Sequence, residues 1–301
     1  MPGVKSITVD EEYKKNPDIS PDDIRKLREW LLTQPHLPAK YITGLDLILT
    51  FHCCERSAEV TKQVLDLHYT LKTLFTSFFQ NRVLDDRLRT ALDTILVQPL
   101  PTPSVLGYRT IYCRLLNPDS KYFHFADAIK LFLMIFDLCQ YEQGTWSGLV
   151  LIIDMDQTTM GHIAKLDVMS VRQILYFLQE CMLIKLKEVH FLNAPNFMDR
   201  LMMLLKPFMK KALMDIIHIH QRDSDTLEPF VAKHSLPKEE GGEFKSRNIL
   251  KEEQFRRIEQ NSEFFKEESH KRVNEASRPG KKTTIEDIFG IQGSFKKLDI
   301  D

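Results

Sequence analysis

The segment from Gly148 to Asp154, GLVLIID, constrains the fold more than any other part of the chain. It is apolar at every position before the final aspartate, so neither face of such a strand is suited to contact with water. A strand of this kind is typical of a sheet that is covered by helices on both sides. The sequence therefore favours an α/β fold.

The segments around this strand alternate between strand-like and helix-like patterns, as expected for an α/β sheet. Apolar residues recur at helical spacing in two of them. Strands are expected over 108–116, 148–154, 188–192 and 215–220, and helices over 123–138 and 168–182.

The N-terminal third of the chain has a different pattern. Ser20 and Pro21 form a helix start, with a hydroxyl cap and a proline at the first helical position, and apolar residues then recur at helical spacing to about residue 93. Three prolines at 99, 101 and 103 interrupt the pattern. The sequence predicts a flexible N-terminus (1–19), a helical domain (20–98), an α/β domain (104–250) and a charged C-terminal helix and tail (251–301).

From Lys238 onward, 28 of 64 residues are charged, 14 basic and 14 acidic. This composition predicts a solvated helix followed by irregular peptide, with apolar residues such as Leu250 and Phe255 able to dock on the main body. No catalysis is expected from this segment.

Net charge and composition exclude several classes of function. The chain has 41 basic and 42 acidic residues, so no overall charge attracts it to nucleic acid. Its apolar runs are too short to span a membrane, and its polar, acidic start lacks the features of a secretory signal, so a cytoplasmic location is expected. The five cysteines show no CxxC pairing and are expected to be reduced thiols rather than zinc ligands.

Asp154 and Asp156 follow the apolar strand in the order Asp-x-Asp-x-Thr, which is how haloacid-dehalogenase phosphatases begin their active site. In that reading Asp154 is a nucleophile, Asp156 is a general acid and Mg²⁺ lies between them. Such enzymes also need a later helix that bears a lysine and a strand that ends in Gly-Asp, for which Asp223-Ser-Asp225 is the only, weak, substitute. The favoured alternative is that both aspartates cap the turn after the strand.

A cluster of histidines raises a second possibility. His218 and His220 alternate on one strand, and His190 on a neighbouring strand could be a third zinc ligand. No acidic or cysteine partner stands at metal-ligand spacing. A structural role is favoured, and no metal or other cofactor is expected.

Five of the 11 methionines fall between Met198 and Met214, in a segment that is apolar around a whole helical turn. Such a helix is either deeply buried or alternates between protein and an oily partner. Pro207 and the lysines 206, 210 and 211 give it a cationic end, which suits a lid that opens against a membrane. Lys185 and Lys187 alternate with apolar residues and could attract lipid phosphates beside that lid.

Taken together, three motifs in the second half of the chain resemble the CRAL-TRIO lipid-binding family. They are SGLVLIIDMDQTT, HFLNAP followed by KPF, and HSLPKEEGG, in the order and spacing of that family. Residues from about Leu37 to Phe79 resemble its helical N-terminal domain. Within the family the chain is most similar to the α-tocopherol-transfer-protein-like group.

The resemblance implies an α/β domain whose sheet forms the floor of an apolar pocket, closed by a lid helix over about Asn193 to Met209. It also implies ligand-binding side chains from the sheet, the helices and the lid. These are Phe123, Phe125, Ile129, Leu149, Leu151, Ile153, Val171, Ile174, Phe177, Leu178, Val189, Phe191, Leu201, Met202 and Leu205.

Some positions differ from the tocopherol-transfer relative. Ala126 and Lys130 stand where two serines line its pocket, and Ala212 and Ile216 replace two of its phosphoinositide-binding basic residues. Lys185 and Lys187 keep two such positions, and Lys210 and Lys211 could supply the others.

The sequence thus predicts a cytoplasmic carrier, not an enzyme, with transient peripheral attachment to phosphoinositide membranes. Its expected ligand is a lipophilic small molecule such as a tocopherol, retinoid or carotenoid. A phospholipid or phosphoinositide exchange protein is the alternative, and the magnesium-dependent phosphatase is the less favoured one.

Overall fold

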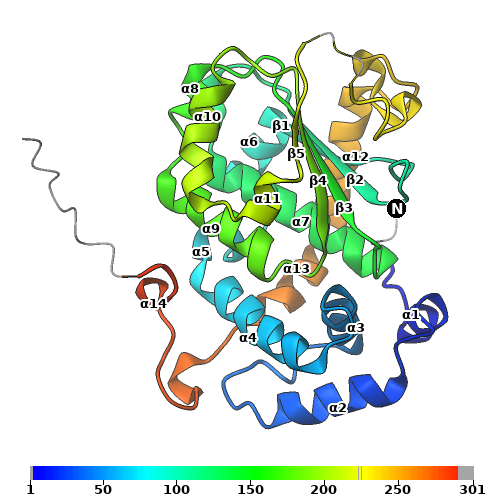
Figure 1. The fold of residues 1–301 in the computed structure, drawn as a ribbon, viewed down its shortest axis with the longest axis vertical. Coiled ribbons are helices and arrows are strands. Elements are labelled where there is room, and N and C mark those ends of the chain that lie inside the picture. The colour runs from blue at the N-terminus through cyan, green and yellow to red at the C-terminus, as the bar shows by residue number, and fades with distance from the viewer. Residues whose placement is uncertain (1–2, 223, 225, 291–301) are drawn as a thin grey trace, which may run out of the picture.

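A five-stranded sheet forms the centre of the computed structural model, which describes residues 3–222, 224 and 226–290 (Figure 1). The strands lie in the order of the sequence, with β1 antiparallel to β2 and all later neighbours parallel. They are β1 (Ile95–Pro99), β2 (Arg109–Leu115), β3 (Leu149–Asp154), β4 (Leu186–Leu192) and β5 (Ile217–Ile219). The α/β fold predicted from the sequence is confirmed.

The central strand β3 is buried on both faces, as its composition predicts. Leu149 and Leu151 pack in a large apolar core with helices α7 (Phe125–Gln143) and α9 (Val168–Glu180). Val150 and Ile152 point to the opposite face, where Leu250 of helix α12 (Arg247–Gln260) completes a second core. Since successive side chains of a strand alternate between faces, one all-apolar strand supports two cores.

Helices α1 to α4 pack around a core of their own, which includes Leu31, Ile48 and Tyr69, whereas α5 and α6 pack in the main core of the α/β domain. The last of them runs directly into β1, so the sheet begins within the region that the sequence assigns to the helical domain. The helices are α1 (Val9–Lys15), α2 (Pro21–Leu32), α3 (Gly44–Cys53), α4 (Ala58–Leu74), α5 (Thr76–Phe79) and α6 (Asp86–Thr94).

The N-terminus differs from the flexible segment expected for residues 1–19. Helix α1 begins with a capping box formed by Thr8 and Glu11. Its Glu12 is fully buried and accepts hydrogen bonds from the backbone N–H (3.1 Å) and hydroxyl (2.7 Å) of Thr145. An acidic residue of a polar segment is thus a tertiary anchor, which local composition does not reveal.

The C-terminal segment is also more tightly packed than its composition suggests. Glu268 lies between two buried ammonium groups: Lys72 donates to it at 2.9 Å, and Lys271 pairs with both Glu268 and Asp46. At its end, the Phe289 ring stacks on Phe75 with centroids 5.9 Å apart. The helices of this segment are α12 (Arg247–Gln260), α13 (Ser262–Ser269) and α14 (Ile285–Phe289).

The remaining helical elements are short. Among the described residues, no helix is both long and apolar enough to cross a membrane. The short elements are α8 (Met160–Ile163), α10 (Met198–Leu205), α11 (Lys211–Met214) and the 3-10 turns Ser120–Tyr122, Lys206–Phe208, Lys233–Ser235, Lys238–Glu240 and Glu275–Ser277.

Candidate ligand-binding cavity

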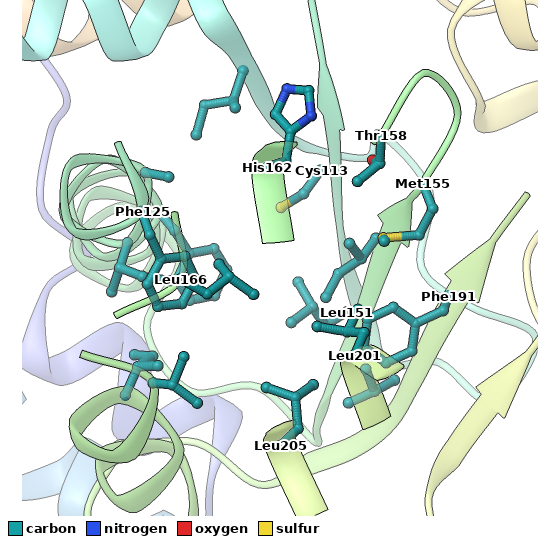
Figure 2. Close-up of a pocket in the computed structure, with 18 of the residues that line it drawn as sticks. Cys113, Phe125, Leu151, Met155, Thr158, His162, Leu166, Phe191, Leu201 and Leu205 are labelled. Carbon is teal, nitrogen blue, oxygen red and sulfur yellow. The ribbon is translucent and has the colours of Figure 1, made fainter. Parts of the chain in front are cut away.

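An apolar cavity of about 280 Å³ lies between one face of the sheet and the helices that cover it (Figure 2). Strands β1 to β5 supply one wall, and α7, α9 and α10 supply the others. The lining side chains are Ile95, Val97, Cys113, Arg114, Leu115, Phe123, Phe125, Ala128, Ile129, Phe132, Leu151, Ile153, Asp154, Met155, Thr158, His162, Ile163, Leu166, Val171, Ile174, Leu175, Leu178, Leu186, Val189, Phe191, Leu201, Leu205, Met209, Leu213 and Ile217.

Most of the side chains that the resemblance assigns to a pocket line this cavity. Three do not, although all three are buried. Leu149 lies at the start of β3, Phe177 packs against His68 and Phe79 on the other side of α9, and Met202 lies among core residues beside Leu201. The lining ones are Phe123, Phe125, Ile129, Leu151, Ile153, Val171, Ile174, Leu178, Val189, Phe191, Leu201 and Leu205.

Helix α10 covers the cavity in the segment expected to be a lid. Leu201 and Leu205 line the cavity, whereas Met203 has 74% of its surface exposed. One side of the helix is therefore apolar and faces the cavity. Met203, which lies between Leu201 and Leu205 in sequence, is an apolar side chain on the exposed side. Its C-terminal end continues into the 3-10 turn Lys206–Phe208, where Pro207 cannot extend a regular helix.

Two positions drawn from the tocopherol-transfer relative do not line the cavity. Ala126 packs beside the apolar core, and the Lys130 ammonium donates to the Gln80 carbonyl at 2.9 Å. Ala128 and Ile129, between them in sequence, face the cavity instead. Because side-chain direction on a helix changes by 100° per residue, neighbouring positions have different environments.

Four polar side chains line the cavity, and two of them are bound to each other. Arg114 donates to the carboxylate of Asp154 at 3.2 Å. The other two are Thr158 and His162, on the turn and short helix after β3. Neither residue belongs to a motif that predicts binding; their one signal in the sequence is a position just beyond the end of the central strand, where ligands commonly bind in α/β sheets.

Asp154 is a structural carboxylate with its oxygens occupied. Oδ2 accepts hydrogen bonds from the Tyr112 hydroxyl (2.5 Å) and from Arg114, and Oδ1 accepts from the Asn193 amide (2.8 Å) and the Asp156 backbone N–H (3.0 Å). Burial and the Asp154 carboxylate raise the pKa of Tyr112 well above its usual value, so the hydroxyl remains a donor. This arrangement supports the turn-capping role over the nucleophile.

The histidine cluster lies on the face of the sheet opposite the cavity. His190 Nδ1 is 2.9 Å from His220 Nε2, and the rings of His190 and His218 stack with centroids 4.8 Å apart. Burial and the neighbouring imidazoles lower the pKa of His190 to about 3. Within the described part of the chain, no group of three His, Cys, Asp or Glu residues is arranged to hold a metal ion.

Three of the four predicted membrane-contacting lysines lie together. Lys185, Lys187 and Lys210 line a hollow of about 390 Å³, which we call the cationic hollow, together with Ala212 and Ile216. Leucines 178, 186 and 213 line both this hollow and the cavity, so the two spaces share a wall.

Each of these lysines has a neighbouring partner. Lys185 pairs with Glu55, Lys210 pairs with Glu180, and the Lys187 ammonium lies 5.7 Å from the Tyr108 ring centroid. Lys211 is not part of the hollow. It is exposed and pairs with Asp215 at 2.6 Å on its own short helix.

Comparison with known proteins identifies the domain that contains the cavity. Residues 99–242 match the family described as CRAL/TRIO domain. This segment of the chain is similar to the CRAL/TRIO domain. Residues 16–87 match the family described as Pinta-like, UBA domain. The CRAL/TRIO match supports a lipid-binding and lipid-transfer protein, as expected from the sequence.

The curated proteins that the chain is similar to include clavesins. Clavesin-1 of Xenopus laevis is 24% identical over 77% of this chain and 70% of its own length. Clavesin-1 of Mus musculus is 26% identical over 77% of this chain and 66% of its own length, and Clavesin-2 of Homo sapiens is 23% identical over 77% and 71%. The chain thus spans about two thirds of the length of these relatives.

Among solved structures, that of Sfh5 aligns over 70% of this chain and 85% of its own, with a TM-score of 0.37 and 8% identity. The assignment of the CRAL/TRIO domain rests on the sequence matches.

Proposed function

We propose that this protein carries one lipophilic small molecule, of the tocopherol, retinoid or carotenoid type, and exchanges it at membranes. The observation that carries the proposal is the cavity of about 280 Å³, whose lining is apolar apart from the Arg114–Asp154 pair, Thr158 and His162. Ligand sites of this kind are mostly apolar, with a few placed polar groups. The CRAL/TRIO domain gives independent support.

The mechanism of such a carrier is physical. A buried ligand gains about 25 cal/mol for each Å² of apolar surface removed from water. Release requires α10 to move away, which exposes Leu201 and Leu205. Contact of these two side chains with lipid offsets the free-energy cost of exposing them. Met203, which is already exposed, can contact the lipid as well.

The cationic hollow supplies the second part of the proposal. Lys185, Lys187 and Lys210 lie beside the segment that leads out of the lid, and each lysine near an anionic membrane contributes about 1 kcal/mol of attraction. We propose that these lysines hold the protein transiently at phosphoinositide-containing membranes. Lys211 is the fourth candidate, on the exposed helix α11 next to them.

The polar lining argues against the alternative of a phospholipid exchange protein. A phosphate headgroup needs several donors, preferably from arginine, and Arg114 already pairs with Asp154, Asp156 and Glu240. No catalytic role is proposed, because the oxygens of the candidate nucleophile Asp154 accept four hydrogen bonds.

The first test is to identify the bound molecule. The protein is purified from its native cells, native mass spectrometry gives the stoichiometry, and organic extraction followed by mass spectrometry identifies the ligand. One isoprenoid-like molecule per chain is the expected result. A stoichiometric phospholipid would favour the alternative, and an empty protein that also fails to take up a fluorescent tocopherol analogue would contradict the carrier.

A further inference from the structure

Two neighbouring thiols lie in the wall of the cationic hollow and have no part in the proposed function. Cys53 is the last residue of α3 and Cys54 is its C-cap, and their Sγ atoms are 3.9 Å apart. Both thiols are free and half-buried, and both residues line the hollow beside Lys185. Two thiols in contact can be oxidised together within one chain, because the second sulfur already lies beside the first.

The two thiols differ in how readily they lose a proton. The hydrogen bond from Cys53 lowers the pKa of the Cys54 thiol below its ordinary value, and Thr61 and the charge of Lys185 lower it further. The contact with Cys54, together with burial, raises the pKa of Cys53 well above its ordinary value. Since the thiolate is the nucleophile, Cys54 is the sulfur that reacts first.

The other cysteines are protected by burial. Burial raises the pKa of the Cys113 thiol to about 12 and that of Cys139 to about 11, and it raises the pKa of Cys181 as well. All five cysteines lie in the part of the chain that the structure describes, and Cys54 is the one among them whose thiol pKa is lowered. Oxidation should therefore begin at Cys54, where the fraction of thiolate is largest.

The backbone around the pair can rearrange without disrupting a long helix. Helix α3 ends at Cys53, and Glu55 and Arg56 follow in the left-handed region with φ of 53° and 63°. A disulfide between Cys53 and Cys54 therefore affects only the last helical turn and the turn after it. The Cα atoms of adjacent residues are about 3.8 Å apart, less than the roughly 4.4 Å that disulfides usually span, so this disulfide is strained. A strained disulfide is more easily reduced, which makes the oxidation reversible.

We propose that Cys53 and Cys54 form a reversible oxidation site for hydroperoxides, in which Cys54 reacts first and Cys53 closes the disulfide. The Cys54 thiolate takes the terminal oxygen of ROOH, the O–O bond breaks, and ROH leaves with the proton that the thiol released, so that Cys54 becomes a sulfenic acid. The Cys53 sulfur then attacks the Cys54 sulfur, the S–O bond breaks, and water leaves with the Cys53 proton. In total, two thiols and one ROOH give one disulfide, one ROH and one water, as two electrons pass from sulfur to oxygen. The site does not depend on the carrier function.

The test oxidises the reduced full chain with hydrogen peroxide, blocks the remaining thiols with N-ethylmaleimide under denaturing conditions, and digests the protein with trypsin without reduction. Residues 41–56 form one tryptic peptide, which contains Cys53 and Cys54 and no other cysteine. The expected product is this peptide, two hydrogen atoms lighter and unblocked, formed at least about 10-fold faster than any oxidation of the other three cysteines. If the peptide keeps two blocked thiols while other cysteines are oxidised, or if all five react at one rate, the inference is wrong.

Serine variants test the order of the two steps. In Cys53→Ser the sulfenic acid at Cys54 has no second thiol to react with, so it should accumulate and form an adduct with dimedone. Cys54→Ser should leave Cys53 as a thiol at the same dose of peroxide. A dimedone adduct at Cys53 in the second variant, and none at Cys54 in the first, would overturn the assigned roles.

Cys181→Ala is the matched control, because Cys181 also lines the hollow but is buried. This variant should form the same disulfide at the same rate as the wild-type protein. Cys181 lies in the tryptic peptide 173–185. A disulfide that joins this peptide to the peptide 41–56 would show that Cys181, and not Cys53, is the partner of Cys54.

Cumene hydroperoxide in a parallel reaction distinguishes the source of the oxidant. Faster oxidation by this reagent than by hydrogen peroxide identifies a lipid-type hydroperoxide, slower oxidation identifies hydrogen peroxide, and no oxidation by either overturns the site. Millimolar glutathione should then restore both thiols, because the disulfide is strained. A disulfide that resists glutathione would contradict the reversible site.

Discussion

At the end of β3, ion pairs and hydrogen bonds of a few side chains connect the sheet, the turn before the lid helix and the C-terminal segment. Arg114 is 98% buried and pairs with Asp154, Asp156 and Glu240. Asn193, whose φ of 51° marks the turn after β4, donates to the same Asp154. A buried charge of this kind requires a partner, because it cannot be solvated otherwise.

We therefore expect Asp154→Asn to destabilise the protein by about 3 kcal/mol, since it leaves the buried Arg114 with a weaker set of partners. Urea unfolding followed by circular dichroism measures this. Asp156→Asn is the matched control, because Asp156 is more exposed and its loss should cost about 1 kcal/mol or less. Equal costs for the two variants would contradict the structural role of Asp154.

Two buried histidines predict a loss of stability in mild acid. Burial lowers the pKa of His68 to about 4, and burial with the neighbouring imidazoles lowers that of His190 to about 3. Below pH 6.5 the unfolded chain binds protons that the folded chain does not, so the free energy of unfolding falls as the pH falls. Each histidine should lower the free energy of unfolding by about 1.4 kcal/mol when the pH falls from 7.5 to 5.5.

Urea unfolding at these two pH values measures the loss, which should be about 3 kcal/mol for the pair. His68→Phe should reduce it by about half. A pH dependence that is the same in wild-type protein and His68→Phe would show that His68 is protonated in the folded state.

At the scale of elements, helix α10 presents apolar side chains both to the cavity and to solvent. Leu201 and Leu205 line the cavity and Met203 projects into solvent. Substitutions on the two sides of this helix of eight residues can therefore test ligand retention and membrane contact separately.

Leu205→Glu places a charge against an apolar cavity and should abolish retention of a fluorescent tocopherol analogue, because a carboxylate there has no partner. Met203→Glu makes the same chemical change on the exposed side. It should leave retention unchanged and slow transfer between vesicles several-fold, because it opposes contact with lipid. Loss of retention in both variants would indicate that α10 has simply unfolded.

For the molecule as a whole, the N-terminal helices and the α/β domain share one surface. The cationic hollow is lined by Cys53, Cys54 and Val60 from the helical part and by Lys185 and Lys187 from the sheet region. The ring of His68 also contacts the α/β domain, where its Nδ1 lies 2.8 Å from the Cys181 carbonyl oxygen. The proposed membrane contact thus includes both parts of the chain.

Lys185→Ala combined with Lys187→Ala should weaken binding to phosphoinositide vesicles by about 10- to 30-fold at low salt, from about 1 kcal/mol for each charge. Ligand retention should not change. Lys26→Ala with Lys266→Ala removes two charges that are more exposed, on α2 and α13, and is the control for an equal loss of charge. Vesicle co-sedimentation measures all three proteins, and equal binding would rule out the hollow as the membrane contact.

Local sequence patterns are sufficient to predict much of this architecture. The all-apolar β3 predicts a doubly covered sheet, and Ser20 with Pro21 predicts the start of α2, where Ser20 caps the helix through a capping box with Asp23. Both depend on residues close together in sequence, whose periodicity and capping are determined by backbone geometry.

Contacts between distant residues could not be predicted in the same way. The burial of Glu12 against Thr145 and of Glu268 against Lys72 depends on partners more than 100 residues away. Charged residues near either end therefore look solvated in the sequence, whereas the folded chain uses them as buried anchors.

The sequence by itself determined the α/β class and the apolar segment that covers the cavity, because hydrophobic period and residue type act locally, whereas the residues of the pocket wall were expected from the family resemblance. Only the tertiary structure decided which side chains face the cavity. It turned Phe177 and Met202 away and brought in His162 with an unpartnered nitrogen. The physical reason is that side-chain direction and hydrogen-bond satisfaction depend on the packing of all surrounding elements at once.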